Sequence, residues 1–77
     1  MSPETADVVV RAFLTEARKL LDEAALLARS AESLAELDHF DRAVDGAIEI
    51  PMILFKAKTA LDAAALVAHS LHSRGAE

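Results

Sequence analysis

Residues 13–34 read FLTEARKLLDEAALLARSAESL, and the architecture of the whole chain can be worked out from this stretch. Apolar residues recur in it every three or four positions, the spacing that keeps side chains on one edge of an α-helix. The spacing continues toward the N-terminus, so the first seam consists of Ala6, Val10, Phe13, Ala17, Leu20, Ala24, Leu27, Ala31 and Leu34. It predicts one helix over about residues 3–37, beginning at Ser2 as a hydroxyl cap and Pro3 as a first-turn proline.

A second seam with the same spacing consists of Phe40, Ala43, Ala47, Ile50, Leu54, Ala57, Leu61, Ala64, Ala68 and Leu71. It predicts a second helix over about residues 39–74, after a turn at about 38–39, with Asp38 as its N-cap. Pro51 lies inside this helix, where a proline removes one hydrogen bond. Either the helix kinks there, or it ends at about Glu49 and a third helix begins at Pro51. Because the seam keeps its phase across Pro51, we expect one kinked helix.

Length and composition indicate that this hairpin does not stand alone. The chain has 77 residues and no cysteine, and 53% of its residues are hydrophobic. Domains below roughly 80 residues usually need disulfides, a metal, exceptional helix packing or a partner subunit. We therefore expect one all-α domain over 1–77, a helical hairpin of two long antiparallel helices that pairs with a second copy as a dimeric four-helix bundle.

The charge argues against several classes of partner. The net charge is −5, and the eight Lys and Arg residues are scattered, whereas nucleic acids and anionic membranes are bound by clustered basic residues. Residues 48–68, the most apolar stretch, contain four charged residues and make a poor transmembrane segment. The N-terminus shows no secretory signal. We expect a soluble, cytoplasmic protein.

The segment 48–55 reads IEIPMILF and is apolar around almost the full circumference of a helix, so we expect it at the centre of an interface. The predicted interface residues are Phe13, Leu20, Leu27, Ile50, Met52, Ile53, Leu54, Phe55 and Leu61. The sequence predicts a non-enzymatic protein–protein interaction or assembly module that self-associates through its apolar heptad faces. A different protein is a possible further partner. No catalytic motif, cofactor motif or metal motif is predicted.

Two other functions stay open from the residues. A kink at Pro51 could open a cavity for a small apolar ligand, with Met52 and Phe55 as its walls. His69 and His72 are three residues apart, a spacing at which two side chains on one helix can ligate a metal. Glu36 and His39 have a similar spacing but fall across the predicted turn.

Two short segments resemble known families. Residues 37–44, with an acidic-aromatic-acidic turn before Ala43 and Val44, resemble the helix-turn-helix junction of tetratricopeptide repeats, which implies a tight turn. Residues 68–71, Ala-His-Ser-Leu, are similar to the motif around the phosphorylated histidine of histidine phosphotransfer domains. That resemblance implies His69 as phosphoacceptor and a receiver domain as partner. The family's motif continues with Lys and Gly, whereas this chain has His72 and Ser73.

Overall fold

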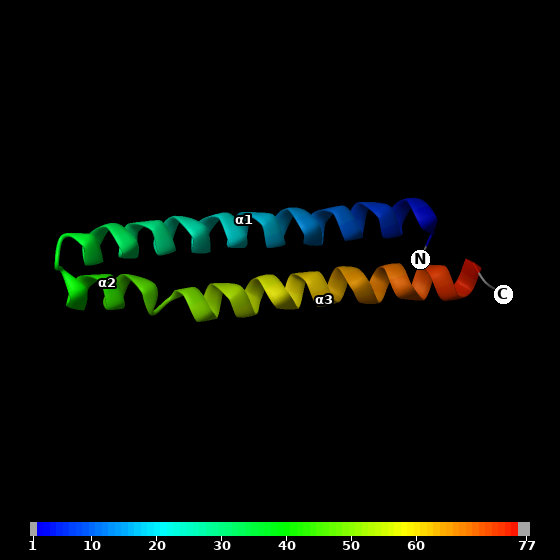
Figure 1. Cartoon of the computed structure of the whole chain (residues 1–77). Coiled ribbons are helices and arrows are strands. Elements are labelled where there is room, and N and C mark those ends of the chain that lie inside the picture. The colour runs from blue at the N-terminus through cyan, green and yellow to red at the C-terminus, as the bar shows by residue number, and fades with distance from the viewer. Residues whose placement is uncertain (1, 76–77) are drawn as a thin grey trace.

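The chain forms an elongated antiparallel helical hairpin (Figure 1). The structure is a computed structural model that describes residues 2–75, and the side chains of residues 2–70. Helix α1 spans Pro3–Glu36, α2 spans Phe40–Ala47 and α3 spans Ile50–Gly75. Helices α2 and α3 follow each other along α1, and the two chain ends lie at the same end of a rod that measures 59 × 15 × 13 Å. The predicted all-α fold is confirmed.

Helix α1 begins and continues as the sequence predicts. The Ser2 side-chain oxygen accepts a hydrogen bond from the Thr5 backbone N–H at 3.2 Å, and Pro3 occupies the first turn. Here the missing proline N–H costs nothing, because the first-turn N–H groups of a helix have no partner within the helix. No glycine or proline interrupts the next 33 residues of this 34-residue helix.

The turn after α1 uses Asp38 differently from the prediction. The His39 N–H donates to the Leu34 carbonyl at 2.8 Å, and the Asp38 N–H donates to the Ala35 carbonyl at 3.0 Å. These two bonds form a Schellman motif, in which the residue after the helix takes left-handed backbone angles. Asp38 has φ 63°, so it terminates α1 instead of capping α2. His39 precedes α2 and makes no side-chain capping bond.

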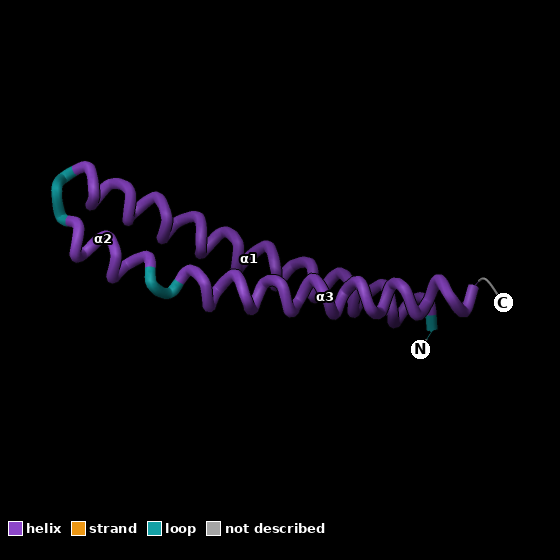
Figure 2. Tube along the Cα trace, turned by 60° about the horizontal axis from the view of Figure 1, so that its bottom comes forward, coloured by secondary structure: helices purple, strands orange, loops and turns teal. Residues whose placement is uncertain are grey.

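The second half of the hairpin is broken, so our expectation of one kinked helix was wrong. Helix α2 ends at Ala47, Ile48 and Glu49 form a turn, and α3 begins at Ile50 (Figure 2). Pro51 therefore stands in the first turn of α3, where its ring and missing N–H are tolerated. Ile48 keeps right-handed helical angles of φ −65° and ψ −23°. We attribute the continuous heptad phase to this near-helical turn.

The seam of α1 is confirmed, whereas the seam of the second half is displaced. All nine predicted residues of α1 are buried or half-buried. Of the residues predicted there, the exposed ones are Phe40, Leu54, Leu61 and Ala68, whereas Ala43, Ala47, Ile50, Ala57 and Ala64 are buried or half-buried. Leu71 lies outside the residues whose side chains are described. The residues that are buried or half-buried at alternating spacings of three and four are Ala43, Gly46, Ile50, Ile53, Ala57, Ala60, Ala64 and Val67.

Side-chain size explains this choice of seam. In an antiparallel hairpin, residues at equal distances from the turn lie at the same level, so Leu20 comes level with Ala57 and Phe13 with Ala64. At these two levels a large residue of α1 meets a small residue of α3, which allows close-packed interdigitation, whereas Leu27 comes level with Ile50. The buried residues of the described chain are Ala6, Ala17, Ala24, Ala43, Ile53, Ala57, Ala60 and Ala64. Seven of these eight are alanines, so no leucine among residues 2–70 is fully enclosed.

Replacing Asp38 with glycine should stabilise the hairpin by about 0.5–1 kcal/mol, because glycine adopts left-handed angles without steric cost. The change also removes a negative charge from the C-terminal end of α1. The free energy of unfolding would be measured by urea denaturation at one fixed protein concentration. Asp41→Gly is the matched control and should destabilise by a similar amount, since Asp41 lies in the first turn of α2. If both variants change the free energy of unfolding in the same direction, Asp38 does not have the left-handed backbone angles assigned to it.

Replacing Ala24 with leucine should destabilise the hairpin by about 1–3 kcal/mol, because the seam has no room for three more carbon atoms. Ala24 is 6% exposed, whereas the neighbouring Ala25 lies on the outer side of α1. Ala25→Leu should therefore change the unfolding free energy by no more than about 0.5 kcal/mol. If both variants unfold at the wild-type urea concentration, the helices are not in contact along this seam.

Candidate interaction surface

The candidate surface is the row of apolar residues immediately beside the seam. On each helix, every second seam residue is directly followed by a residue of this row. The residues of the row are therefore seven positions apart. We call this row the apolar flank. Its members are Leu14, Leu21 and Ala28 of α1, Phe40 and Ala47 of α2, and Leu54, Leu61 and Ala68 of α3.

The hairpin has two arms, one formed by α1 and the other by α2 and α3. The apolar-flank residues of both arms lie on the same side of the hairpin. Both helices are right-handed and run in opposite directions, so the residue one step past the seam turns toward the same side on each helix. Leu21 of α1 therefore comes beside Leu54 of α3, and Leu14 beside Leu61. The four leucines form one patch near the middle of the rod. This patch is contiguous with the seam but is not covered by it.

The four leucines remain between 41% and 47% exposed in the isolated chain. The opposite side of the seam has a different character. There the corresponding positions hold Val9, Glu16, Glu23 and Ser30 on α1 and Lys56, Ala63 and Ser70 on α3. Over residues 14–28 and 54–70 the hairpin is thus two-sided, with one apolar flank and one mainly polar flank. Such asymmetry is typical of a helical face that packs against another apolar surface. Exposed apolar residues without such a role would be distributed over both flanks.

The structure divides the predicted interface residues into two groups. Phe13, Leu20, Leu27, Ile50 and Ile53 line the seam between the two arms, where they are half-buried or buried. The remaining four predicted residues, Met52, Leu54, Phe55 and Leu61, are exposed. Sequence reasoning missed Leu14 and Leu21, although each directly follows a seam residue. The pairs Phe13-Leu14 and Leu20-Leu21 were the signal that a third heptad position is apolar.

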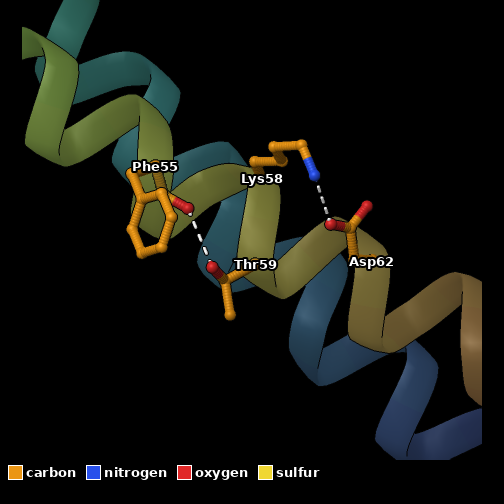
Figure 3. A network of polar contacts seen from close by, with 4 residues as sticks. All are labelled: Phe55, Lys58, Thr59 and Asp62. Carbon is orange, nitrogen blue, oxygen red and sulfur yellow. Dashed lines mark hydrogen bonds and ion pairs between the residues drawn. The ribbon is translucent and has the colours of Figure 1, made fainter.

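A second group of exposed apolar residues surrounds the break between α2 and α3. Val44, Ile48, Met52 and Phe55 are all at least 60% exposed. In Figure 3, the Phe55 ring projects from the side of α3 that faces away from α1, and the Thr59 hydroxyl donates to the Phe55 carbonyl at 2.9 Å. Met52 and Phe55, the two residues considered as walls of a ligand cavity, are thus both largely exposed in the isolated chain.

Polar contacts between side chains do not join the two arms within residues 2–70. The ion pairs there are Arg11–Asp7, Arg18–Asp22 and Lys58–Asp62, each between residues one helical turn apart and each solvent-exposed. No polar side chain is buried in this part of the chain. The arms are thus held together by apolar packing, and exposed ion pairs of this kind contribute about 0.3–0.5 kcal/mol each.

The residues considered for other chemistry are dispersed. His69 is exposed near the end of α3, and the side chain of His72 lies outside the described residues. Glu36 ends α1, whereas His39 precedes α2, and both are exposed. Within the described part of the chain, no three His, Cys, Asp or Glu residues are grouped so that they could hold a metal ion. The structure gives no helix, over residues 2–75, with the length and hydropathy needed to span a bilayer.

Comparison with known proteins does not assign this chain to a family. No protein-family model, no curated protein and no solved structure matches this chain.

Asp62→Asn should lower the unfolding free energy by at most about 0.5 kcal/mol, although the Lys58 Nζ–Asp62 Oδ2 distance of 2.7 Å is the shortest of the three ion pairs (Figure 3). Urea denaturation at low and high salt would measure the difference, with Glu16→Gln as a control outside any ion pair among residues 2–70. A loss above 2 kcal/mol would mean that this exposed ion pair within α3 contributes far more to stability than exposed pairs of this kind do.

Proposed function

We propose that this protein is a non-enzymatic protein–protein interaction module that self-associates through its apolar flank, so that two hairpins form a four-helix bundle. The observation that carries the proposal is the two-sidedness of the hairpin. Leu14, Leu21, Leu54 and Leu61 lie together on one flank and are only about half covered by their own chain. A second copy presents the same patch, and like patches of this kind are self-complementary in a two-fold dimer.

The dimensions of the hairpin suit such a dimer. A face 59 Å long and 15 Å wide spans roughly 900 Å². A stable interface takes about 800 Å² from each partner. A single flank is therefore large enough for one standard interface, provided that most of its length is used. The helices of the second hairpin would then lie over the groove between α1 and α3, as in other four-helix bundles.

The free energy of covering the leucines is of the right size. Fully burying an exposed leucine contributes about 1.5–3 kcal/mol, and each of the four is 41–47% exposed. Completing the burial of eight leucines in a dimer thus contributes about 5–11 kcal/mol. Association itself costs about 4–15 kcal/mol. Alanine and Phe40 contacts along the flank add to the gain, so we expect a dimer of moderate affinity.

The experiment compares two leucine-to-glutamate variants on the same helix. Leu54 lies on the apolar flank, whereas Leu66 lies on the outer side of α3 and is 67% exposed. Molar mass in solution would be measured by sedimentation equilibrium at micromolar concentrations. We expect wild type and Leu66→Glu to be dimers and Leu54→Glu to be a helical monomer. A charge at the centre of the flank would be buried without a partner, which costs several kcal/mol.

Far-ultraviolet circular dichroism keeps the result interpretable, because a monomer that retains its helix content has lost the interface and not the fold. Dissociation by Leu66→Glu but not by Leu54→Glu would move the interface to the outer face. A wild type that is a folded monomer would contradict self-association and would direct attention to a different protein as the partner of the flank.

A further inference from the structure

The negative charge of this protein is concentrated at the turn end of the hairpin. Residues 29–49 contain six acidic residues and two arginines, a net charge of −4 out of −5 for the whole chain. The acidic residues are Glu32, Glu36, Asp38, Asp41, Asp45 and Glu49, and all are exposed. The net negative charge is therefore distributed unevenly along the length of the hairpin.

The other part of the described chain is nearly balanced. The three ion pairs found within residues 2–70 lie outside this segment, in residues 7–22 and 58–62. The leucine patch of the apolar flank lies in this balanced middle region, since its members are residues 14, 21, 54 and 61. A dimer can thus be centred on the leucines in either of two orientations, and the charge of the turn ends distinguishes them.

We infer that the two hairpins pair with their turn ends at opposite ends of the bundle. The inference rests on the proposed self-association and specifies its geometry. With the turn ends together, two segments of net charge −4 would face each other across helices packed about 8–10 Å apart. With the turn ends apart, they are separated by most of the 59 Å length of the rod. The Debye length is about 8 Å at physiological ionic strength and about 30 Å at 0.01 M, so the preference is greatest at low salt.

The test measures distances between spin labels on the full-length chain, which has no native cysteine. Glu36→Cys carries the label at the turn end, and Lys19→Cys carries it near the middle; both native residues are exposed. In a dimer centred on the leucines with turn ends apart, the two Glu36 labels should be roughly 50 Å apart, at a rise of 1.5 Å per residue. The two Lys19 labels should be within about 30 Å, since four-helix bundles are only two helices wide.

The two labels separate failure of the orientation from failure of the proposed function. A short Lys19 distance with a Glu36 distance near 50 Å, at about 0.01 M ionic strength, supports the inference. A short distance for both labels overturns the orientation but leaves self-association intact. The absence of any intermolecular distance for Lys19 overturns both.

A charge-neutralised variant tests the physical cause. In the Glu36→Cys background residues 29–49 carry a net charge of −3, and Asp41→Asn, Asp45→Asn and Glu49→Gln together reduce it to 0. In the spin-labelled Glu36→Cys background, this variant should show a second, short distance from dimers with turn ends together. If the long distance alone persists, electrostatic repulsion between the turn ends does not select the orientation.

Discussion

The close approach of α1 and α3 along a line of alanines is the constraint on which the rest of this structure depends. Two helices share only one strip of contact, and here the strip is filled mainly by residues such as Ala17, Ala24, Ala57 and Ala64. Small side chains allow the helices to approach closely, but they bury little apolar area per residue. Larger residues such as Phe13, Leu20 and Leu27 are only half-buried in the seam, and the leucines of the apolar flank lie directly beside it.

The same constraint links the fold to the proposed function. Dispersion and hydrophobic burial stabilise a hairpin of this size only marginally, since conformational entropy opposes them at almost equal magnitude. A second copy on the flank would enclose the leucines and complete a core that one hairpin lacks. Folding and association are then coupled, and the stability of the hairpin should rise with protein concentration.

The sequence predicted α1 better than the rest of the chain, for physical reasons. In α1 the Ser2 cap and Pro3 define the start of the helix, and no later glycine or proline interrupts it. In the second half three neighbouring heptad positions are apolar, so spacing alone could not decide between Ile53 and Leu54, or between Ala60 and Leu61. The choice depends on the size of the residues opposite on α1. The role of Asp38 could not be predicted from the residue type, because it depends on the backbone angles of the turn. The break at Ile48–Glu49 could not be predicted from the spacing of apolar residues, because it does not alter the heptad phase.

The central claim is that the flank leucines are covered by another copy of the chain. Isotope-filtered nuclear Overhauser spectroscopy on an equal mixture of labelled and unlabelled protein tests it most directly, because it detects only contacts between different molecules. We expect intermolecular contacts among the methyl groups of Leu14, Leu21, Leu54 and Leu61. Intermolecular contacts confined to Ile48, Met52 and Phe55, or none at all at a concentration where the protein is folded, would contradict it.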